Sequence, residues 1–240
     1  MDSGGASLRA NLDVVEETRF GVWFLGTQVW KEHVLQRAIK DLRRLAGDRM
    51  PVAPILADVG CGSGQSFSLL CEHFAPRRLI GVDVDPAALA RAAAAARGLP
   101  GHAIDLHRGT SAAMPLPSES VDVLFCHQTF HHFVDQDSAL AEFRRVLRPG
   151  GLLLFAESTR AYIHSWIIRL LFRHPMDVQK TAPEYLAMVR AGGFTVADEA
   201  ISYPYLWWSR SDLGVLERWF RIAPRPQHEE TLINLVAVRK

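Results

Sequence analysis

The stretch from Ile55 to Gly64, ILADVGCGSG, constrains the fold more than any other part of the chain, because an apolar run passes directly into three alternating glycines. Apolar residues then recur at helical spacing from Phe67 to Phe74. Glycines suit a tight turn between a strand and a helix, because they tolerate positive φ and leave backbone N–H groups open to a ligand. The stretch therefore predicts a strand, a ligand-binding turn and a helix.

The rest of the chain continues this alternation of strand and helix. Seven short apolar runs, separated by helix-like segments, are predicted strands: 55–59, 79–83, 103–106, 121–126, 152–156, 195–201 and 232–238. Alternation of this kind indicates a parallel α/β sheet with helical crossovers. An amphipathic helix is predicted before the sheet, over residues 29–45.

Capping signals mark the starts of three further helices. The expected N-caps are Asp85 before Pro86, either Asp137 or Ser138, and Thr181 in a capping box with Glu184. The sequence Arg148-Pro149-Gly150-Gly151 is expected to stop the second of these helices before the next strand.

Composition argues against several classes of function. Lys and Arg number 27 and Asp and Glu 26, without a long run of like charge, so the basic surface expected for nucleic-acid binding is missing. Neither a secretory leader nor a run of about 18 apolar residues is present, and we expect a cytoplasmic protein. The three cysteines include no CxxC pair, which favours buried thiols over disulfides or a thiolate metal site.

A carboxylate stands at the end of the second predicted strand. Asp83 follows Gly81 and Val82, nineteen residues after Gly64. An acidic side chain at this position can bind the two hydroxyls of a ribose. The glycine turn and Asp83 together indicate a ligand that contains a nucleoside.

With these motifs the sequence resembles the class I S-adenosylmethionine-dependent methyltransferases, especially the small-molecule branch that includes ubiquinone and menaquinone biosynthesis enzymes. The resemblance covers about Ile55 to Glu157, and its segments occur in the family's order: Asp58 to Gly64, Gly81 to Pro86, Met114 to Pro117, Ser120 to Leu124, His131-His132 and Leu147 to Gly151. It implies a doubly wound, Rossmann-like α/β sheet of seven mainly parallel strands in the order 3-2-1-4-5-7-6, with an antiparallel last strand.

The resemblance also implies roles for individual residues. The turn of Gly60, Gly62 and Gly64 would lie under the methionine part of S-adenosylmethionine, and Asp58 would approach its amino group. Asp83 would bind the ribose, and His127 would lie beside the sulfonium. The family's acidic residue for adenine falls at Thr110, a departure, so a hydroxyl and the backbone N–H of Ser111 would take over that contact.

We expect one methyltransferase domain over residues 1–240. Its parts would be an N-terminal helical lid at 1–50, a donor-binding core at 51–157 and a substrate-side half at 158–240, with inserts at 158–180 and 203–227. Two other hypotheses remain: a catalytically inactive donor-binding protein with a regulatory or assembly role, and an NAD-dependent oxidoreductase. The oxidoreductase is disfavoured because the third glycine comes one position earlier than in GxGxxG. The segment Leu147 to Gly151 also has no role in a dehydrogenase.

Three histidines follow the fourth predicted strand. His127 and His131 are four residues apart, a spacing seen in metal ligands, but two ligands are too few for a site and we expect no metal. His132 is the candidate general base, needed only if the acceptor must lose a proton before attack. Methyl transfer is otherwise an in-line displacement, which depends on alignment in a dry pocket.

The two inserts would both overhang the methyl-transfer edge of the sheet. The first predicts an amphipathic helix over 163–171, and the second is rich in aromatic residues. We expect Trp23, Trp166 and Trp208 to contact a small, apolar or aromatic acceptor. Packing into the core is the alternative for these side chains, and contact of the 163–171 helix with a membrane surface is disfavoured because the helix is short.

Overall fold

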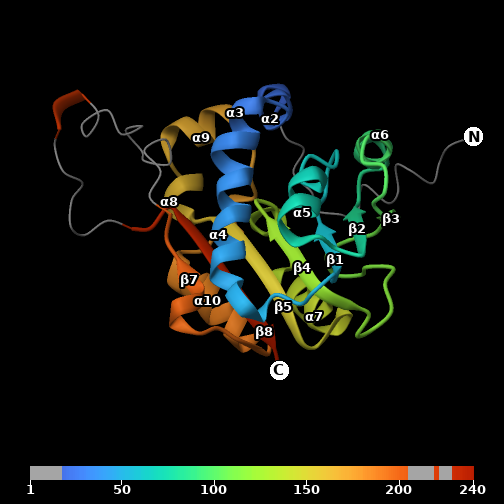
Figure 1. Ribbon diagram of the computed structural model, residues 1–240. Coiled ribbons are helices and arrows are strands. Elements are labelled where there is room, and N and C mark those ends of the chain that lie inside the picture. Colours follow the sequence, from blue (N-terminus) through green and yellow to red (C-terminus); the bar gives the residue numbers. More distant parts are fainter. Residues whose placement is uncertain (1–17, 205–218, 222–228) are drawn as a thin grey trace, which may run out of the picture.

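A computed structural model describes residues 18–204, 219–221 and 229–240 (Figure 1). Its centre is one sheet built of β1 (Ile55–Val59), β2 (Arg78–Asp83), β3 (Ile104–Arg108), β4 (Val121–His127), β5 (Leu147–Ser158), β6 (Phe194–Thr195), β7 (Ile201–Ser202) and β8 (Leu232–Arg239). The strand order is β3-β2-β1-β4-β5-β8-β6, and β7 also pairs with β8. The first five strands are parallel and β8 is antiparallel to β5. The predicted topology is confirmed, with the sixth predicted strand divided into β6 and β7.

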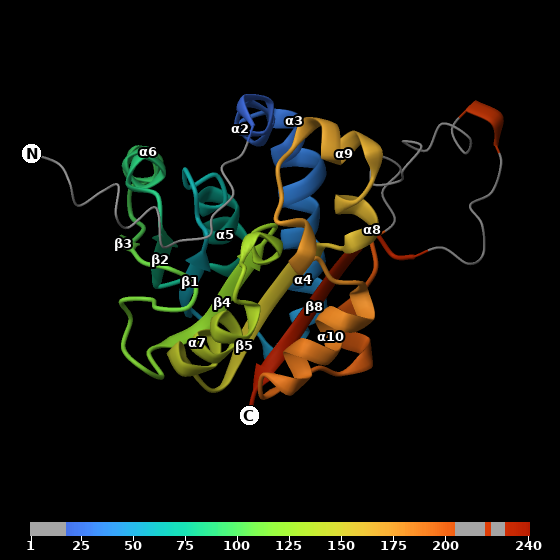
Figure 2. The same ribbon diagram turned by 180° about the vertical axis from the view of Figure 1, so that it is seen from behind.

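Helices cover both faces of this sheet. In chain order they are α2 (Arg19–Leu25), α3 (Gln28–Trp30), the π-helix η1 (Lys31–Leu35), α4 (Gln36–Ala46), η2 (Gly47–Arg49), α5 (Phe67–Phe74), α6 (Pro86–Arg97), η3 (Phe130–His132), α7 (Gln136–Val146), α8 (Arg160–Ile163), α9 (Trp166–Leu171), η4 (Met176–Val178), α10 (Ala182–Ala191) and η5 (Asp198–Ala200). In Figure 1, α4 and α5 lie in front of the sheet. In Figure 2, α7 and α10 lie in front of its opposite face.

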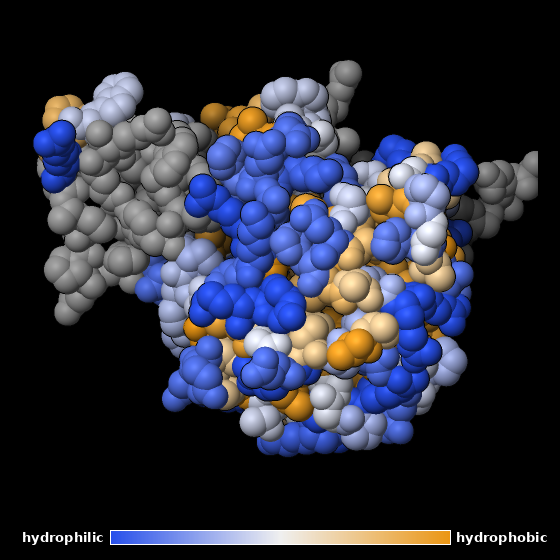
Figure 3. All heavy atoms as spheres, viewed as in Figure 1, coloured by the Kyte–Doolittle hydropathy of each residue, from blue (hydrophilic) through white to orange (hydrophobic). Residues whose placement is uncertain are grey.

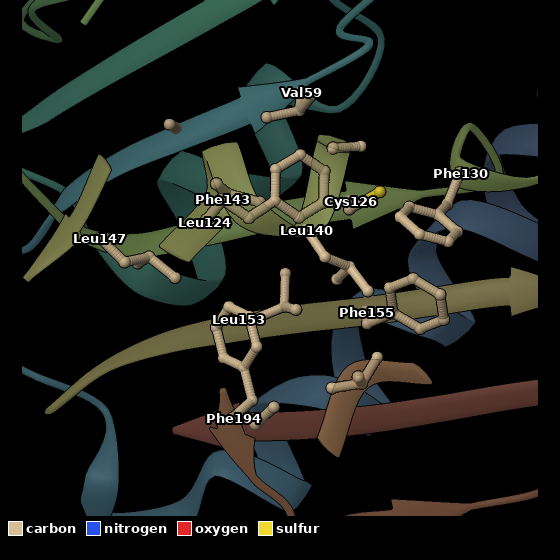
Figure 4. Packing of buried hydrophobic residues seen from close by; sticks show 14 of the residues in the cluster. Val59, Leu124, Cys126, Phe130, Leu140, Phe143, Leu147, Leu153, Phe155 and Phe194 are labelled. Atoms are coloured by element: carbon tan, nitrogen blue, oxygen red, sulfur yellow. The ribbon is translucent and has the colours of Figure 1, made fainter. Parts of the chain in front are cut away.

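Each face of the sheet has its own apolar core. On the α7 side, Leu140 and Phe143 point towards β4 and β5, and Phe130 packs edge-on against Phe155 with ring centres 5.2 Å apart (Figure 4). On the other side, α4 buries Ile39 and Leu42 against the sheet. The outer surface of α4 is hydrophilic (Figure 3), and the amphipathic helix predicted over 29–45 is present as α3, η1 and α4 in succession.

One local prediction was wrong because α7 starts at Gln136, earlier than the sequence pattern indicated. The cap of α7 is Asp135, whose carboxylate accepts from the N–H of Ser138, rather than Asp137 or Ser138. As predicted, α7 ends at Val146, just before residues 148–151. These residues form an irregular start of β5, since Val121 pairs with Leu147 and Val123 already pairs with Leu152. The caps at Asp85 and Thr181 are confirmed.

The predicted 163–171 helix is broken into α8 and α9. The chain becomes extended at Ser165 (φ −61°, ψ 145°), so α9 starts with a new phase. Ile163 and Ile168 are buried, whereas Trp166 and Leu170 face solvent. The predicted apolar stripe was therefore wrong in its exposed members. Within the described residues, the helices are too short or too polar to cross a membrane.

Candidate functional site

The glycine turn lies between β1 and α5, at the carboxyl edge of the parallel strands. Gly60, Gly62 and Gly64 have φ of 72°, 53° and 76°. A Cβ on Gly60 would lie 2.3 Å from the Thr129 hydroxyl oxygen, and one on Gly64 would lie 2.6 Å from the Phe67 ring. A Cβ on Gly62 would meet no atom within 4 Å. The outer two glycines therefore allow close packing, while Gly62 faces the open space that a ligand can enter.

Asp58 is a buried carboxylate directly beneath this turn. It accepts a hydrogen bond from the Ser66 hydroxyl. Burial raises the pKa of Asp58 to about 7, against the lowering effect of the Ser66 bond and with a smaller raising effect of Asp83. A carboxylate held in a low-dielectric site gains most from a cationic partner. The ammonium group of an amino acid would be such a partner.

Asp83, at the end of β2, accepts hydrogen bonds from the glycine turn and from the start of the next helix. One carboxylate oxygen accepts from the N–H of Gly62 at 2.8 Å, and the other accepts from the N–H of Asp85 at 2.9 Å. Each oxygen keeps a further lone pair for a ligand hydroxyl. The sequence did not reveal this bond between the carboxylate and the glycine turn, because it joins two motifs from different strands.

Thr110 and Ser111 lie in the loop after β3, the strand that pairs with β2. The N–H of Gly109 donates to the carbonyl of Asp83 at 3.1 Å, which fixes the loop beside the end of β2. Thr110 forms a β-bridge with Ala113, and both Thr110 and Ser111 are half-buried. These two residues are therefore brought to the same edge as the glycine turn and Asp83.

His127 ends β4 and is nearly buried between aromatic rings. Its ring centre lies 5.7 Å from that of Trp30 and 5.8 Å from that of Phe125. Burial, aided by the nearby His131, lowers the pKa of His127 to about 3, so the imidazole is neutral. Its Nε2 has no hydrogen-bond partner within the described part of the chain. The sulfonium position beside His127 remains a prediction from the resemblance.

A cavity of about 460 Å³ adjoins His127 on the side away from the glycine turn. Its wall includes Gln128 after β4, Arg37 and Asp41 of α4, and Asn234 of β8. Asn234 donates to Asp41 at 2.8 Å, which joins α4 to β8. Sequence reasoning missed this cavity because the helix-face pattern placed the polar side of α4 in solvent.

Behind the β4 loop, three histidines form a cluster. One of them contacts a buried glutamate that sequence reasoning did not select. His131, His132 and His174 each have a ring nitrogen within 4.8 Å of the other two, and His127 is not part of this group. His131 Nδ1 lies 2.6 Å from Glu157, which is fully buried at the end of β5. A charged residue at the end of an apolar strand was the signal that could have found Glu157.

The expected lid residues are placed only in part. Trp23 and Trp166 are 61% and 66% exposed, and neither lines the cavity described above. Trp208, and most of the 203–227 insert, lie outside the described residues. The N-terminal segment does touch the first insert, since the Thr18 hydroxyl donates to the Leu171 carbonyl at 2.5 Å. Figures 1 and 2 both show α2 and α9 side by side.

The sequence of the chain is similar to those of known methyltransferases. Residues 57–155 match a family described as the methyltransferase domain. A probable S-adenosylmethionine-dependent methyltransferase of Mycolicibacterium smegmatis is 37% identical over 189 residues, covering 76% of this chain and 70% of that protein. A ubiquinone biosynthesis O-methyltransferase of Bradyrhizobium is 34% identical over 125 residues, covering 52% and 46%. The chain thus spans about half the length of this and other curated relatives.

Solved structures show the same fold. A SAM-dependent methyltransferase from Aquifex aeolicus superposes with a TM-score of 0.64 at 16% identity, covering 91% of this chain and 96% of that one. At this identity the likeness concerns the fold alone. It agrees with the α/β fold described above.

Proposed function

Because the chain belongs to the class I S-adenosylmethionine-dependent methyltransferases, we propose that it transfers a methyl group from S-adenosylmethionine to a small, apolar or aromatic acceptor. The observation that carries this proposal is the buried Asp58 beneath a glycine turn whose Gly62 N–H donates to Asp83. The buried carboxylate suits the ammonium of the donor, and the second carboxylate suits its ribose. S-adenosylhomocysteine is the product.

The other donor contacts complete this proposal. Thr110 and the N–H of Ser111 would bind the adenine, since the bond from Gly109 to Asp83 brings their loop to the ribose end. Gly60, Gly62 and Gly64 would lie along the methionine part, and His127 would lie near the sulfonium. In the transfer itself the acceptor attacks the methyl carbon, the sulfur keeps the electron pair of the broken C–S bond, and any acceptor proton passes to water or a base.

The acceptor would lie on the far side of His127 from the glycine turn. The cavity there lies between α4 and the ends of β4 and β8, so it adjoins the place where the methyl would be presented. A relative named as a ubiquinone biosynthesis O-methyltransferase supports an aromatic acceptor. Trp23, Trp166 and Trp208 are proposed to close over it, and His132 is proposed as a base only for acceptors that need one.

Donor affinity is expected to depend on pH through Asp58. Because burial raises its pKa to about 7, the carboxyl is largely neutral at pH 6 and loses its attraction for the donor's ammonium. Affinity should fall about eightfold from pH 7.5 to pH 6, because the ionised fraction of Asp58 falls by about that factor. Asp83, Cys61 and Cys126 also face this group, and burial raises the pKa of both thiols, so they stay neutral.

Calorimetric titrations of S-adenosylhomocysteine at both pH values measure this effect. The control is Asp58→Asn, which is expected to bind more weakly and with little change between pH 6 and 7.5. An affinity of the unaltered protein that is equal at both values would show that Asp58 does not pair with the ligand's amino group.

Transfer itself is tested with S-adenosylmethionine labelled in the methyl group. The protein is incubated with a panel of phenols, hydroquinones and aromatic acids, with bulk RNA and protein as comparison acceptors. We expect label in a solvent-extractable product, together with an equal amount of S-adenosylhomocysteine. Asp83→Ala is the matched control for background methylation. Donor binding without labelled product from the panel or from a cell extract would favour the inactive, regulatory hypothesis.

A further inference from the structure

We propose that His131, His132 and His174 bind one divalent metal ion of the zinc type, which fastens the 158–180 insert to the sheet. The sequence predicted no metal, because His127, His131 and His132 did not form a convincing ligand set. The structure leaves His127 outside the cluster and adds His174 from the segment between α9 and η4. The inference is independent of the methyl donor, but a metal-bound His132 would not be the base proposed above.

The spacing of the three rings fits a common ion. The ring centres are 4.3 Å apart for His131 and His132, 5.1 Å for His131 and His174, and 4.9 Å for His132 and His174. With Zn–N bonds of about 2.0–2.1 Å and tetrahedral angles, the centres of bound imidazoles lie roughly 5 Å apart. The observed separations are of this size, and one ring nitrogen of each histidine lies within 4.8 Å of the other two.

Glu157 orients the first of these ligands from behind. Its Oε2 lies 2.6 Å from Nδ1 of His131, so Nε2 is the nitrogen left for a metal. Its Oε1 accepts from the backbone N–H groups of Thr129 and Phe130 at 3.0 and 2.8 Å. Metal-bound histidines usually donate their second ring nitrogen to such a carboxylate, which fixes the ring and makes it a better ligand.

The charges around Glu157 also favour a cation at this place. The carboxylate is fully buried at the end of β5, and within the described residues the ring of His131 contacts its Oε2. A buried carboxylate without a nearby positive charge is costly. A divalent ion on the far nitrogen of His131 would supply that charge. In the rival explanation, the contact with His131 is sufficient for Glu157, and the other two imidazoles only pack against His131.

The proposed ion would tie together segments that are distant in the sequence. His131 and His132 lie in η3, directly after β4, whereas His174 lies in the insert. Gln179, at the end of the insert, donates to the carbonyl of His131 at 2.8 Å. Phe172, two residues before His174, packs against Phe20 of α2 with ring centres 5.8 Å apart. An ion here would therefore steady both the insert and the N-terminal segment.

Titration of tag-free, chelator-treated protein with Zn²⁺ and with Co²⁺ tests the site. We expect one ion per chain, a higher melting temperature with Zn²⁺, and visible Co²⁺ absorption of a four-coordinate site with nitrogen ligands. His174→Ala should abolish stoichiometric binding, and Glu157→Gln should weaken it roughly 10–100-fold. His164→Ala is the matched control, because this exposed histidine of the same insert is outside the cluster.

Circular dichroism and S-adenosylhomocysteine binding would establish that each variant is folded. His174→Cys provides a second check, because a thiolate can replace the imidazole as a ligand and should shift the Co²⁺ absorption. The proposal fails if the unaltered protein binds neither ion, or if His174→Ala binds as well as His164→Ala. The three histidines would then only pack against one another. Donor binding should persist after chelation, so this failure would not affect the proposed methyl transfer.

Discussion

Replacing Trp166 with alanine is expected to lower kcat/KM for the acceptor by roughly 2–4 kcal/mol of transition-state stabilisation, about 30- to 1000-fold. The ring is 66% exposed on α9, so its removal should cost little packing within the protein. A large ring that closes over an acceptor both contacts it and excludes water from the displacement. Donor affinity should not change, because the glycine turn and Asp83 lie on other elements.

The measurement compares methyl transfer to the best aromatic acceptor with melting temperature and donor binding. Trp166→Phe, which keeps a ring, should recover most of the loss. Val52→Ala, a trimmed apolar side chain that is 97% exposed, is the control for surface changes. If stability and donor binding fall together with activity, Trp166 has a structural role. If turnover is normal, the ring of Trp166 does not close over the acceptor.

Replacing Asp83 with alanine is expected to weaken S-adenosylmethionine binding by about 1.5–3 kcal/mol, roughly 10- to 150-fold in Kd. The variant would lose the proposed ribose contacts and also the acceptor for the N–H of Gly62, so the turn would lose part of its preorganisation. Calorimetry with S-adenosylhomocysteine measures the change.

Two variants refine this second expectation. Asp83→Asn keeps one carbonyl oxygen for the turn or a hydroxyl and should lose less affinity than alanine. Asp105→Ala removes a carboxylate from neighbouring β3, where it pairs with Arg78 at the surface, and should bind normally. An unchanged Kd in Asp83→Ala would contradict the assignment of this carboxylate to the donor.

Features set by local pattern could be predicted from the sequence. The glycine turn requires positive φ whatever surrounds it, and all three glycines have it. Strand order followed from the family resemblance, and the caps at Asp85 and Thr181 followed from bonds within one turn of helix. The helix over 163–171 failed because one extended residue, Ser165, changes the phase of everything after it.

The parts of the site that depend on long-range contacts could not be predicted. His174 is separated from His131 in the sequence by α7, β5, α8 and α9, and only the fold brings the two together. The bond from Gly62 to Asp83 and the bond from Asn234 to Asp41 also join distant segments. Periodicity shows which face of an element is apolar, but it does not show which polar side chains meet across the fold.

The measurement that tests the central claim most directly is calorimetric titration of the purified protein with S-adenosylmethionine, S-adenosylhomocysteine and NAD. Binding of the two sulfur nucleotides with micromolar Kd is expected, because Asp58 and Asp83 match an ammonium and a ribose on either side of the glycine turn. NAD is expected not to bind. Binding of NAD without binding of either sulfur nucleotide would contradict the account.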